Sequence, residues 1–389
     1  MDTRHDFPLL KNNPRLVYLD SACTSLKPRQ VIDAEISYYE TLGACGGRSS
    51  HRLGRKTSEM VGQAREKVAS FAGMNADGLV WTKNATEGLN IVASGLDYPK
   101  RKNVVTTEME HHSVLLPLIG LRDAGKITLE ILKAVDGMVP ESSWEAVDKE
   151  TALIITHDWN NTTGSGQDVK KLARIAHDNG ALICVDGAQG VPHHKSDYRD
   201  VDFLCFSSHK MLGPTGIGAI IAKDLSAIRP IMSGGGTVKE LRNGEMIALH
   251  GHERFEAGVQ HYAGIAGFAA ACDYLKKIGM DKVESHERML AGEMKKALDD
   301  AGAVVYGPPG KRDGALFSFG FKGARPHDIA LMLDKQDIAV RSGFFCAQPA
   351  MEAMGAEGGA ARASAYIYNT PEDVKRFGEA LGTISALYR

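Results

Sequence analysis

The sequence contains Ala181-Leu182-Ile183-Cys184-Val185-Asp186-Gly187-Ala188-Gln189, an apolar run that ends in an aspartate and a glycine. A short run of aliphatic residues bounded by a turn residue predicts a buried β-strand over 181–186. In open α/β sheets, ligands collect at the carboxyl ends of the strands. Asp186 therefore stands at a position suited to binding or chemistry.

Similar short runs recur from about residue 79 onward and alternate with helical patterns such as 168–179. The other expected strands are 79–82, 103–107, 152–156, 201–206 and 217–222. Strands separated by amphipathic helices predict a mostly parallel sheet that is covered by helices on both faces. The fold class is therefore α/β.

The pattern changes around residues 258–267, where longer helices and then shorter strands follow. The expected helices are 264–278 and 280–301, and the expected strands are 303–306, 315–320, 338–341 and 361–365. These elements predict a second, smaller α+β domain. We expect a large domain over 25–260 and a small domain over 1–24 and 261–389. The Gly- and Ala-rich stretch 354–363 is typical of a flexible loop.

Composition limits the possible partners. The 389 residues carry 46 Lys and Arg against 48 Asp and Glu, a formal net charge of -2, with no basic block. This balance argues against nucleic acid and membrane surfaces and favours a small-molecule or protein partner. The N-terminus lacks a signal-peptide core and no apolar run is long enough to span a bilayer, so we expect a cytosolic protein. The six cysteines have no zinc or disulfide spacing, so most are expected to be reduced and buried, with no metal site.

A lysine follows the aspartate by about two dozen residues, in Phe206-Ser207-Ser208-His209-Lys210-Met211-Leu212-Gly213-Pro214. Alone, Asp186 is more often a cap or turn residue and Lys210 a solvated side chain. Together they look like the aspartate and the imine-forming lysine of a pyridoxal 5'-phosphate enzyme. Asp186 would keep the pyridine nitrogen protonated, and Lys210, in a partly apolar pocket, would act as nucleophile and base.

Further residues are suited to holding that cofactor. Gln189 is expected to donate to the ring hydroxylate, and Ser207 and His209 to bind the phosphate. Thr86 lies where 84–90 opens a helix after a strand, which favours either an anion site or a plain N-cap. His111 follows the strand 103–107 and would stack on the pyridine ring, although alone it is more often an interior histidine.

With these residues in place, the chain resembles the class V aminotransferase superfamily of fold-type I pyridoxal-phosphate enzymes. Within it, the chain resembles the SUF-type, group II cysteine desulfurases and selenocysteine lyases. The resemblance runs almost end to end, through Leu16–Ala22, Ala85–Gly88, Glu110–His112, Asp186–Gln189, Ser207–Lys210, Arg254–Gly258 and Arg362–Ser364. It implies a seven-stranded large-domain sheet and pyridoxal phosphate as the cofactor.

The stretch Val340-Arg341-Ser342-Gly343-Phe344-Phe345-Cys346-Ala347-Gln348-Pro349 resembles the nucleophile loop of the desulfurases. The resemblance implies that Cys346 carries the persulfide and that Arg362 grips the substrate carboxylate, for which a guanidinium is suited. A buried cysteine and a structural salt bridge are the alternatives. The short separation of these two residues is typical of group II, and Arg341 is implied as a second substrate-binding residue.

Other parts of the pattern survive only in part. His51 and Arg48 lie in a stretch that resembles the family's substrate-side segment. The family has one asparagine near the ring hydroxyl, which here is Asn161 or, less well, Asn160.

Three departures from the family pattern bear on the site. Val259 replaces a threonine that reaches the phosphate of the neighbouring subunit, so that contact is missing or comes from Gln260. Phe344 and Phe345 replace two histidines before the cysteine, and Asp158-Trp159 adds bulk beside the cofactor. The substrate range is therefore expected to differ from that of the family.

The expected function is that of a homodimeric cysteine desulfurase. It would convert L-cysteine to L-alanine and leave the sulfur on Cys346 as a persulfide for an acceptor protein, for example in iron–sulfur cluster assembly. Lys210 would transfer the α-proton, Asp186 would stabilise the electron sink and Arg362 would orient the substrate. The alternatives are a selenocysteine lyase, another carbon–sulfur lyase or aminotransferase, and a non-catalytic sulfur-relay scaffold.

Overall fold

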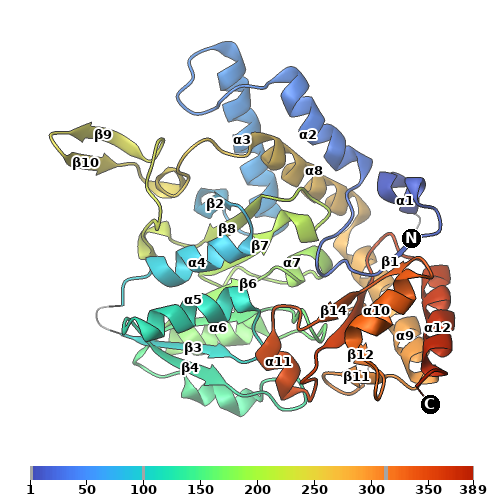
Figure 1. Cartoon of the computed structure of the whole chain (residues 1–389). Coiled ribbons are helices and arrows are strands. Elements are labelled where there is room, and N and C mark those ends of the chain that lie inside the picture. Colours follow the sequence, from blue (N-terminus) through green and yellow to red (C-terminus); the bar gives the residue numbers. More distant parts are fainter. Residues whose placement is uncertain (1–2, 99–100, 311–313, 389) are drawn as a thin grey trace.

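A seven-stranded sheet forms the centre of the computed structural model, which describes residues 3–98, 101–310 and 314–388 (Figure 1). The strand order is β2-β8-β7-β6-β5-β3-β4. In this sheet β8 runs antiparallel to the other six strands, which share one direction. The strands are β2 (Leu79–Thr82), β3 (Asn103–Thr107), β4 (Thr128–Leu132), β5 (Thr151–His157), β6 (Leu182–Asp186), β7 (Phe203–Ser207) and β8 (Gly218–Ala222).

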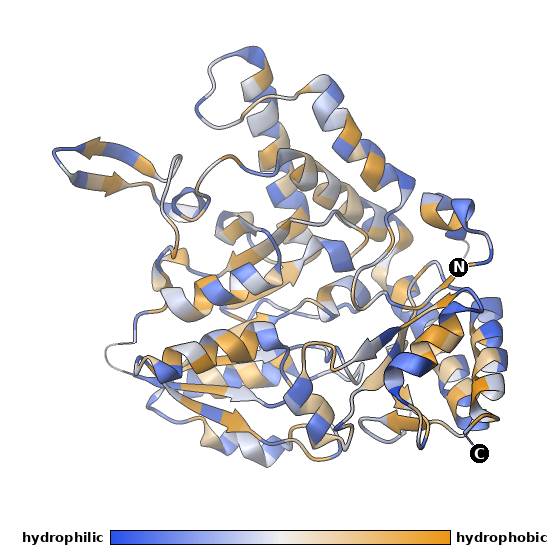
Figure 2. Cartoon of the chain, in the orientation of Figure 1, coloured by the Kyte–Doolittle hydropathy of each residue, from blue (hydrophilic) through white to orange (hydrophobic). Residues whose placement is uncertain are grey.

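The central strand β6 is buried on both faces. Ile183 and Val185 pack in one core with helices α3 (Arg52–Phe71), α6 (Val169–Asp178) and α8 (Tyr262–Ile278). Cys184, on the opposite face, packs with α4 (Ala85–Gly95) and α5 (His112–Asp123). Burial on both faces explains why the strand reads as a continuous apolar run. In Figure 2, hydrophobic and hydrophilic residues alternate around the covering helices.

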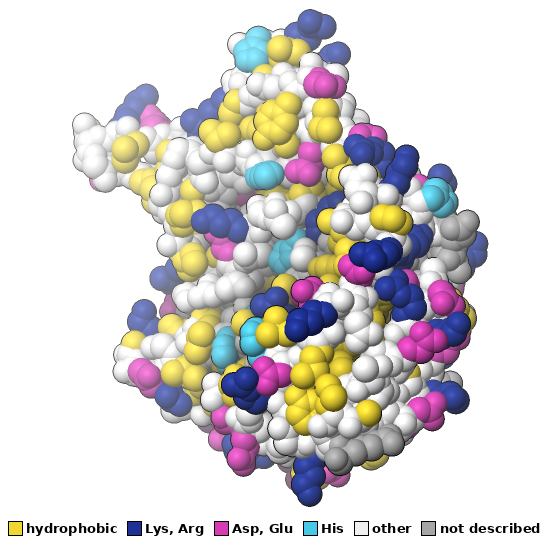
Figure 3. Space-filling model, turned by 45° about the vertical axis from the view of Figure 1, so that its right-hand side comes forward, with side chains coloured by type: hydrophobic (Ala, Val, Ile, Leu, Met, Phe, Trp, Pro, Cys, Tyr) yellow, Lys and Arg dark blue, Asp and Glu magenta, His cyan; other side chains and the backbone are white. Residues whose placement is uncertain are grey.

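The remaining helices and strands around the seven-stranded sheet are short or lie at its periphery. Helices α1 (Pro8–Asn12), α2 (Arg29–Thr41) and α7 (Gly190–His193) complete it, and α2 packs against α8. Strands β9 (Val238–Arg242) and β10 (Glu245–Ala248) form an antiparallel hairpin that projects from the body of the protein (Figure 1). On the face shown in Figure 3, basic and acidic side chains are interspersed. No helix in the described ranges has the length and apolar content that a membrane span needs.

A second, four-stranded antiparallel sheet lies in the C-terminal part, with the order β11-β12-β15-β14. Its strands are β11 (Val304–Tyr306), β12 (Leu316–Gly320), β14 (Arg341–Gly343) and β15 (Ala360–Ser364). Helices α9 (Met280–Asp300), α10 (Pro326–Asp334), α11 (Gln348–Ala353) and α12 (Pro371–Ser385) accompany it. Near the N-terminus, β1 (Val17–Tyr18) pairs with β13 (Ile338–Ala339), so the start of the chain returns to the C-terminal part.

The predicted fold class is confirmed: an α/β fold with a mostly parallel seven-stranded sheet and a smaller strand-containing part. The proposed division into 25–260 and 1–24 with 261–389 stays a prediction. In the structure, α8 shares its core with the large sheet, because Ile265, Phe268 and Leu275 pack there. Residues 1–2, 311–313 and 389 of the predicted small domain lie outside the described residues.

Three local expectations differ from the structure. The flexible loop expected over 354–363 is wrong in its second half, since β15 begins at Ala360 and its five residues are buried. The small alanine side chains of β15 fit between β12 and β14. The composition of this strand is therefore similar to that of a loop. The single strand expected over 338–341 is two strands, β13 and β14. Strand β4 was not expected; it is the sheet edge, and its exposed Thr128 and Glu130 make its sequence polar.

Gly218 leaves no room for a side chain where β8 begins. A Cβ there would lie 2.7 Å from Asn84 Cα and 2.7 Å from the carbonyl oxygen of Phe206. We expect Gly218→Ala to lower the free energy of unfolding by about 1–3 kcal/mol, because backbone must move to relieve the overlap. Urea unfolding followed by circular dichroism measures this change.

Gly62→Ala is the matched control. Gly62 lies in α3, and a Cβ there would meet nothing within 4 Å. Its substitution should be neutral or should raise the free energy of unfolding by up to about 1 kcal/mol, since alanine favours a helix interior. Equal effects of the two substitutions would contradict the packing argument.

Candidate active site

A cavity of about 180 Å³ opens where the parallel strands end. Almost all of the candidate site residues from the sequence line it. β6 ends at Asp186, and β7 leads directly into the turn with Lys210. The sequence-predicted residues that line the cavity are Thr86, His111, Asn161, Asp186, Gln189, Ser207, His209, Lys210, Arg341, Cys346 and Arg362. Their individual roles stay predictions.

The two charged groups that led the sequence argument influence each other in this cavity. Burial raises the pKa of Asp186, while Lys210 and the backbone N–H of Ala188, at 3.0 Å from Oδ1, oppose the rise. Burial lowers the pKa of Lys210, and Asp186 opposes that change. A lowered pKa increases the fraction of neutral amine, which is the form that attacks a carbonyl carbon.

The turn that carries Lys210 is held by contacts from two distant segments. The backbone N–H of Ala85, at the start of α4, donates to Ser207 Oγ at 2.8 Å. The N–H of Ser25 donates to the carbonyl of His209 at 2.9 Å, and Ser25 Oγ accepts from the N–H of Leu212 at 2.7 Å. Leu212 has a φ of 66°, a left-handed conformation that these contacts stabilise.

Gln189 and His209 are two further polar residues of the cavity wall. Gln189 Nε2 donates to the carbonyl of Ala22 at 2.9 Å, which fixes its amide at the cavity wall. Burial, followed by Lys210, lowers the pKa of His209 to about 4. His209 is therefore a neutral imidazole at neutral pH.

The start of α4 differs from the simplest sequence interpretation. The N-cap residue is Asn84, whose side chain accepts from the N–H of Glu87 at 3.0 Å, so the plain N-cap alternative for Thr86 is wrong. Thr86 instead lies in the first turn, and its hydroxyl is 2.6 Å from Ser113 Oγ. A hydroxyl at a helix N-terminus that faces a cavity is suited to an anionic group.

His111 is the N-cap residue of α5. Its Nδ1 accepts from the N–H of Ser113 at 3.1 Å. Burial, followed by the charge of Lys210, lowers the pKa of His111 to about 3. The imidazole is therefore neutral at neutral pH, as a ring that stacks on a cationic heterocycle should be.

The structure separates the two candidate asparagines. Asn160 is turned into the protein, where its Nδ2 donates to the carbonyl of Met109 at 2.7 Å and its Oδ1 accepts from the N–H of Thr162 at 2.8 Å. Asn161 lines the cavity. Its Nδ2 donates to the carbonyl of Phe345 at 2.9 Å, so it also holds the loop of Cys346.

Arg362 is buried at the wall of the cavity, with 2% of its surface exposed. One guanidinium nitrogen donates to the carbonyl of Asn161 at 2.8 Å, and another lies 3.5 Å from Asp20 Oδ1. Burial lowers its pKa, and Asp20 opposes that change. Arg341 on β14 pairs directly with Arg362 on the neighbouring strand β15. One of its guanidinium nitrogens lies 3.7 Å from Oδ2 of Asp20.

Cys346 is exposed, in the loop between β14 and α11. Phe345 and Cys346 both have a positive φ, 54° and 56°, and the carbonyl of Cys346 accepts from the N–H of His112 at 2.6 Å. The expectation that most cysteines are buried is wrong, because only Cys184, Cys205 and Cys272 are.

Phe344 and Phe345 form an apolar support for the nucleophile loop. Phe345 is buried, and its ring lies 4.8 Å below the guanidinium carbon of Arg362. Phe344 packs with it against Met351 and Met354. The aromatic pair therefore stabilises the loop and the arginine together.

Several sequence candidates lie away from the cavity. His51 is exposed and caps α3, where its Nδ1 accepts from the N–H of Gly54 at 3.1 Å. Arg48 is exposed and donates to the carbonyl of Val238 at the base of the hairpin. Val259 is exposed, and the amide of Gln260 donates to the carbonyl of Glu256 at 3.0 Å.

The structure also shows functional candidates that the sequence argument missed. Glu110 is buried, and its Oε1 is 2.9 Å from Nδ1 of His157, which lines the cavity. Burial disfavours the charged imidazole, but Glu110 outweighs it and raises the pKa of His157. Asp20 and Cys23 are the other omissions. In the sequence, the Glu110-His111-His112 motif was the feature that could have indicated a role for Glu110 and its partner His157.

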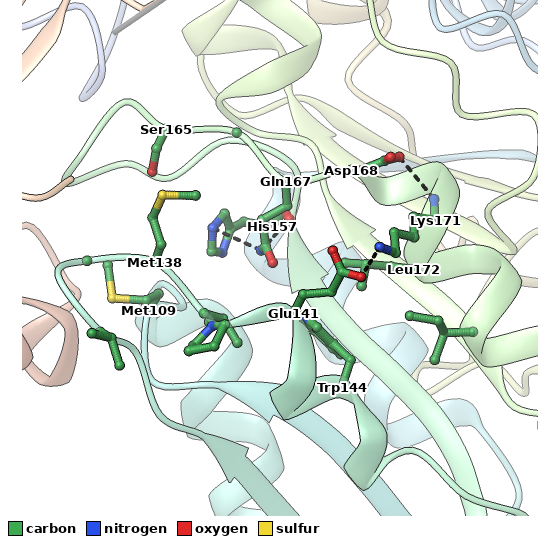
Figure 4. Close-up of a pocket in the computed structure, with 16 residues that line it drawn as sticks. Met109, Met138, Glu141, Trp144, His157, Ser165, Gln167, Asp168, Lys171 and Leu172 are labelled. Atoms are coloured by element: carbon green, nitrogen blue, oxygen red, sulfur yellow. Dashed lines mark hydrogen bonds and ion pairs between the residues drawn. The ribbon is translucent and has the colours of Figure 1, made fainter. Parts of the chain in front are cut away.

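A second cavity, of about 400 Å³, lies behind His157, which lines both (Figure 4). Met109, Trp144 and Leu172 give it apolar walls, and an ion pair joins Lys171 to Glu141. It contains neither the lysine and aspartate nor the cysteine of the first cavity. The chemistry therefore belongs to the smaller one.

The residues of the smaller cavity fit pyridoxal phosphate. They provide an amine in Lys210, a carboxylate in Asp186, a neutral imidazole in His111 and a helix N-terminus with the hydroxyl of Thr86. Arg362 adds a buried cation whose Nε has no hydrogen-bond partner among the described residues. The amine can bind the aldehyde of the cofactor, the carboxylate its pyridine nitrogen and the imidazole its aromatic ring. The helix N-terminus suits its phosphate, and the buried cation suits the carboxylate of a substrate.

Known proteins share this architecture across nearly the whole chain. Residues 17–377 match the family model described as aminotransferase class-V. A probable cysteine desulfurase of Methanothermobacter thermautotrophicus is 38% identical, over 99% of this chain and 98% of its own. A cysteine desulfurase of Haloferax volcanii is 36% identical, over 99% and 96%. The apo structure of a cysteine desulfurase from Thermococcus onnurineus has a TM-score of 0.93 at 35% identity, over 100% and 97%.

The chain belongs to the class V aminotransferase family, as its motifs predicted. Within that family it is similar to proteins named cysteine desulfurases, and the structure of one from Escherichia coli has a TM-score of 0.89 at 31% identity, covering 99% of this chain and 98% of that one. The family depends on pyridoxal phosphate, so the expected cofactor is confirmed. The narrower assignment to group II stays a prediction.

Asp158 anchors the segment that leads to Asn161. It is buried, its Oδ1 accepts from the N–H of Trp159 at 2.6 Å, and its Oδ2 accepts from the hydroxyl of Tyr198. Trp159 turns to the cavity wall and stacks on His194, with ring centroids 3.4 Å apart. Burial raises the pKa of Asp158 to about 7.

This pKa predicts a pH dependence of stability. The folded state keeps a proton that an unfolded aspartate loses near pH 4, so the contribution of Asp158 to stability falls as the pH rises from about 4 to about 7. The slope is about 1.4 kcal/mol for each pH unit in that window. We expect the free energy of unfolding of the unsubstituted protein, minus that of Asp158→Asn, to fall by about this amount for each pH unit across the window, measured by urea unfolding at intervals of pH.

Asp33→Asn serves as the control, because Asp33 is an exposed carboxylate on α2. It should keep the slope of the unsubstituted protein. An Asp158→Asn protein with an unchanged slope would show that Asp158 is ionised in the folded state throughout the window.

Proposed function

We propose that the chain converts L-cysteine to L-alanine and captures the sulfur as a persulfide on Cys346. The observation that carries the proposal is that Lys210, Asp186 and Cys346 line one cavity together with a buried arginine. Relatives named cysteine desulfurases, similar over nearly the whole chain, support the same reaction. The alternative of a non-catalytic scaffold has little support, because this cavity keeps a complete set of reactive groups.

Each reactive group has a distinct task. Bound pyridoxal phosphate supplies an electron sink for the electrons released at the substrate α-carbon. Asp186 holds the charge of the pyridine nitrogen, and Lys210 moves the α-proton. Arg362 binds the substrate carboxylate, with Arg341 beside it on the neighbouring strand. Cys346 attacks the substrate sulfur as a thiolate.

The cofactor-binding tasks follow from the walls of the cavity. We assign the phosphate to Thr86, Ser207 and His209, which border the start of α4. His111 stacks on the ring, and Asn161 and Gln189 face the ring hydroxyl. His51 has no such position in the single chain, and its part in substrate binding stays a prediction.

The fate of the sulfur follows from the exposure of Cys346. An exposed persulfide is accessible to a second protein, so we propose an acceptor protein that docks at this loop and serves a pathway such as iron–sulfur cluster assembly. The cytosolic location expected from the sequence stays a prediction.

The first test combines cofactor and reaction. We expect the purified protein with pyridoxal phosphate to show a visible absorption band, and Lys210→Ala to lose both this band and the covalent link of cofactor to protein. Alanine formation from cysteine should fall by at least about 100-fold, because the proton-transfer group is missing. Absorption spectroscopy, mass spectrometry after borohydride reduction and an alanine assay measure these changes.

Cys346→Ser should keep the absorption band but lose sulfur capture, because the cofactor site is intact and the nucleophile is gone. Cys45→Ser is the control, since Cys45 is exposed and does not line the cavity. Turnover of cysteine by Cys346→Ser at the rate of Cys45→Ser would refute the role of Cys346.

We also propose that the chain forms a homodimer through the projecting hairpin. Leu241 and Met246 pair directly across β9 and β10, so their side chains lie on one face, and they are 67% and 55% exposed. Exposed apolar pairs on a two-stranded hairpin are typical of a covered surface. A second copy of the chain is the partner that the family resemblance implies.

We expect the protein to sediment as a dimer and the double variant Leu241→Asp, Met246→Asp to sediment as a monomer, because two charges would be buried. Leu387→Asp, at a leucine that is 67% exposed near the C-terminus, is the control and should stay dimeric. Analytical ultracentrifugation measures the masses. If the unsubstituted protein sediments as a monomer, the proposal of a homodimer is wrong.

A further inference from the structure

A second thiol lines the cavity that holds Lys210 and Cys346. Cys23 lies in the segment between β1 and α2, and its side chain is partly buried. Its surroundings differ from those of the other cysteines. Cys184, Cys205 and Cys272 are buried in the cores, and Cys45 is exposed outside this cavity.

Basic groups surround the sulfur of Cys23. Arg341 donates from one guanidinium nitrogen to Cys23 Sγ at 2.9 Å. Arg362, Lys210 and Lys27 also interact electrostatically with this thiol. Asp20, 3.7 Å from Arg341, and the phenol of Tyr18 are the acidic groups on the same side. The guanidinium of Arg341 therefore lies in hydrogen-bond contact with the sulfur atom that would react.

A buried donor at the same place points to an anion in the cavity. The Nε of Arg362 has no hydrogen-bond partner among the described residues, although the residue is only 2% exposed. Such a group in a protein interior is normally satisfied. Within the cavity, the anions available to it are the substrate carboxylate, a thiolate and a persulfide.

We propose that Cys23 is a second sulfur carrier, which receives the sulfane sulfur from Cys346. The Cys23 thiolate attacks the outer sulfur of the Cys346 persulfide, and a new bond forms between Cys23 Sγ and that sulfur. The bond between the outer sulfur and Cys346 Sγ breaks, and its electron pair leaves with Cys346 as a thiolate. The outer sulfur keeps its proton, and no external oxidant or reductant is consumed.

The proposed transfer rests on the proposed role of Cys346 as the first sulfur acceptor. It would change how many turnovers the enzyme completes without an acceptor protein. Sulfur held on Cys23 lies beside Arg341 in the wall of the cavity. Cys346 is then free to accept a second sulfur before any acceptor arrives. The enzyme would therefore store two sulfur atoms for each chain.

The test follows sulfur on the complete, cofactor-loaded protein. The protein is incubated with excess L-cysteine without an acceptor, and the reaction is stopped with an alkylating reagent. Peptide mass spectrometry then locates each added sulfur atom. We expect added sulfur on both Cys346 and Cys23, and close to two sulfur atoms for each chain.

Variants give the order of transfer. Cys23→Ser should form alanine in the first turnover and hold sulfur on Cys346 only, at one atom for each chain. Cys346→Ser should leave Cys23 without sulfur, because its donor is missing. Cys45→Ser should retain the pattern of the unsubstituted protein.

Four outcomes would overturn the inference. Sulfur on Cys346 but never on Cys23 would leave the proposed function standing and remove the second carrier. Sulfur on neither residue would remove both. Sulfur on Cys23 in the Cys346→Ser protein would mean direct loading instead of transfer. A disulfide between the two cysteines, with release of sulfide, would mean attack on the inner sulfur.

Discussion

The buried guanidinium of Arg362 joins three parts of the chain that are distant in sequence. It donates to the carbonyl of Asn161, lies 3.5 Å from Asp20 and covers the ring of Phe345 at 4.8 Å. A buried charge costs several kcal/mol unless its partners are in place, so these segments must assemble together. The contacts set the cysteine loop against the sheet that carries Lys210.

Parallel strands explain why the remaining groups converge. Strands β5, β6 and β7 run side by side in one direction, so His157, Asp186 and Ser207 end at the same edge of the sheet. Helix α4 begins at that edge, and Ser207 accepts from its first N–H. A cavity with a carboxylate, an amine and a helix N-terminus is therefore a consequence of topology as much as of composition.

The same contacts give single residues two tasks each. Asn161 lines the cavity and holds the loop of Cys346 through the carbonyl of Phe345. Arg341 lines the cavity beside Arg362 and also donates to the sulfur of Cys23. Asp20 lies close to both arginines, which stand opposite each other on β14 and β15 and would otherwise repel. Both thiols that line the cavity interact electrostatically with Lys210.

The sequence by itself determined the fold class and the strand that ends at Asp186, because these depend on local periodicity. Its motifs and the family resemblance also singled out Lys210 and Cys346, which line one cavity in the structure. It misplaced the second half of 354–363, missed the polar edge strand β4 and favoured Asn161 over Asn160 without excluding the latter. Only the tertiary structure decided that Asn161 and Cys23 line the cavity and that Asp20 lies beside both of its arginines. Those positions depend on contacts between distant segments, which no local pattern encodes. Asn161 and Phe345 are 184 residues apart, and β1 and β13 are more than 300 residues apart.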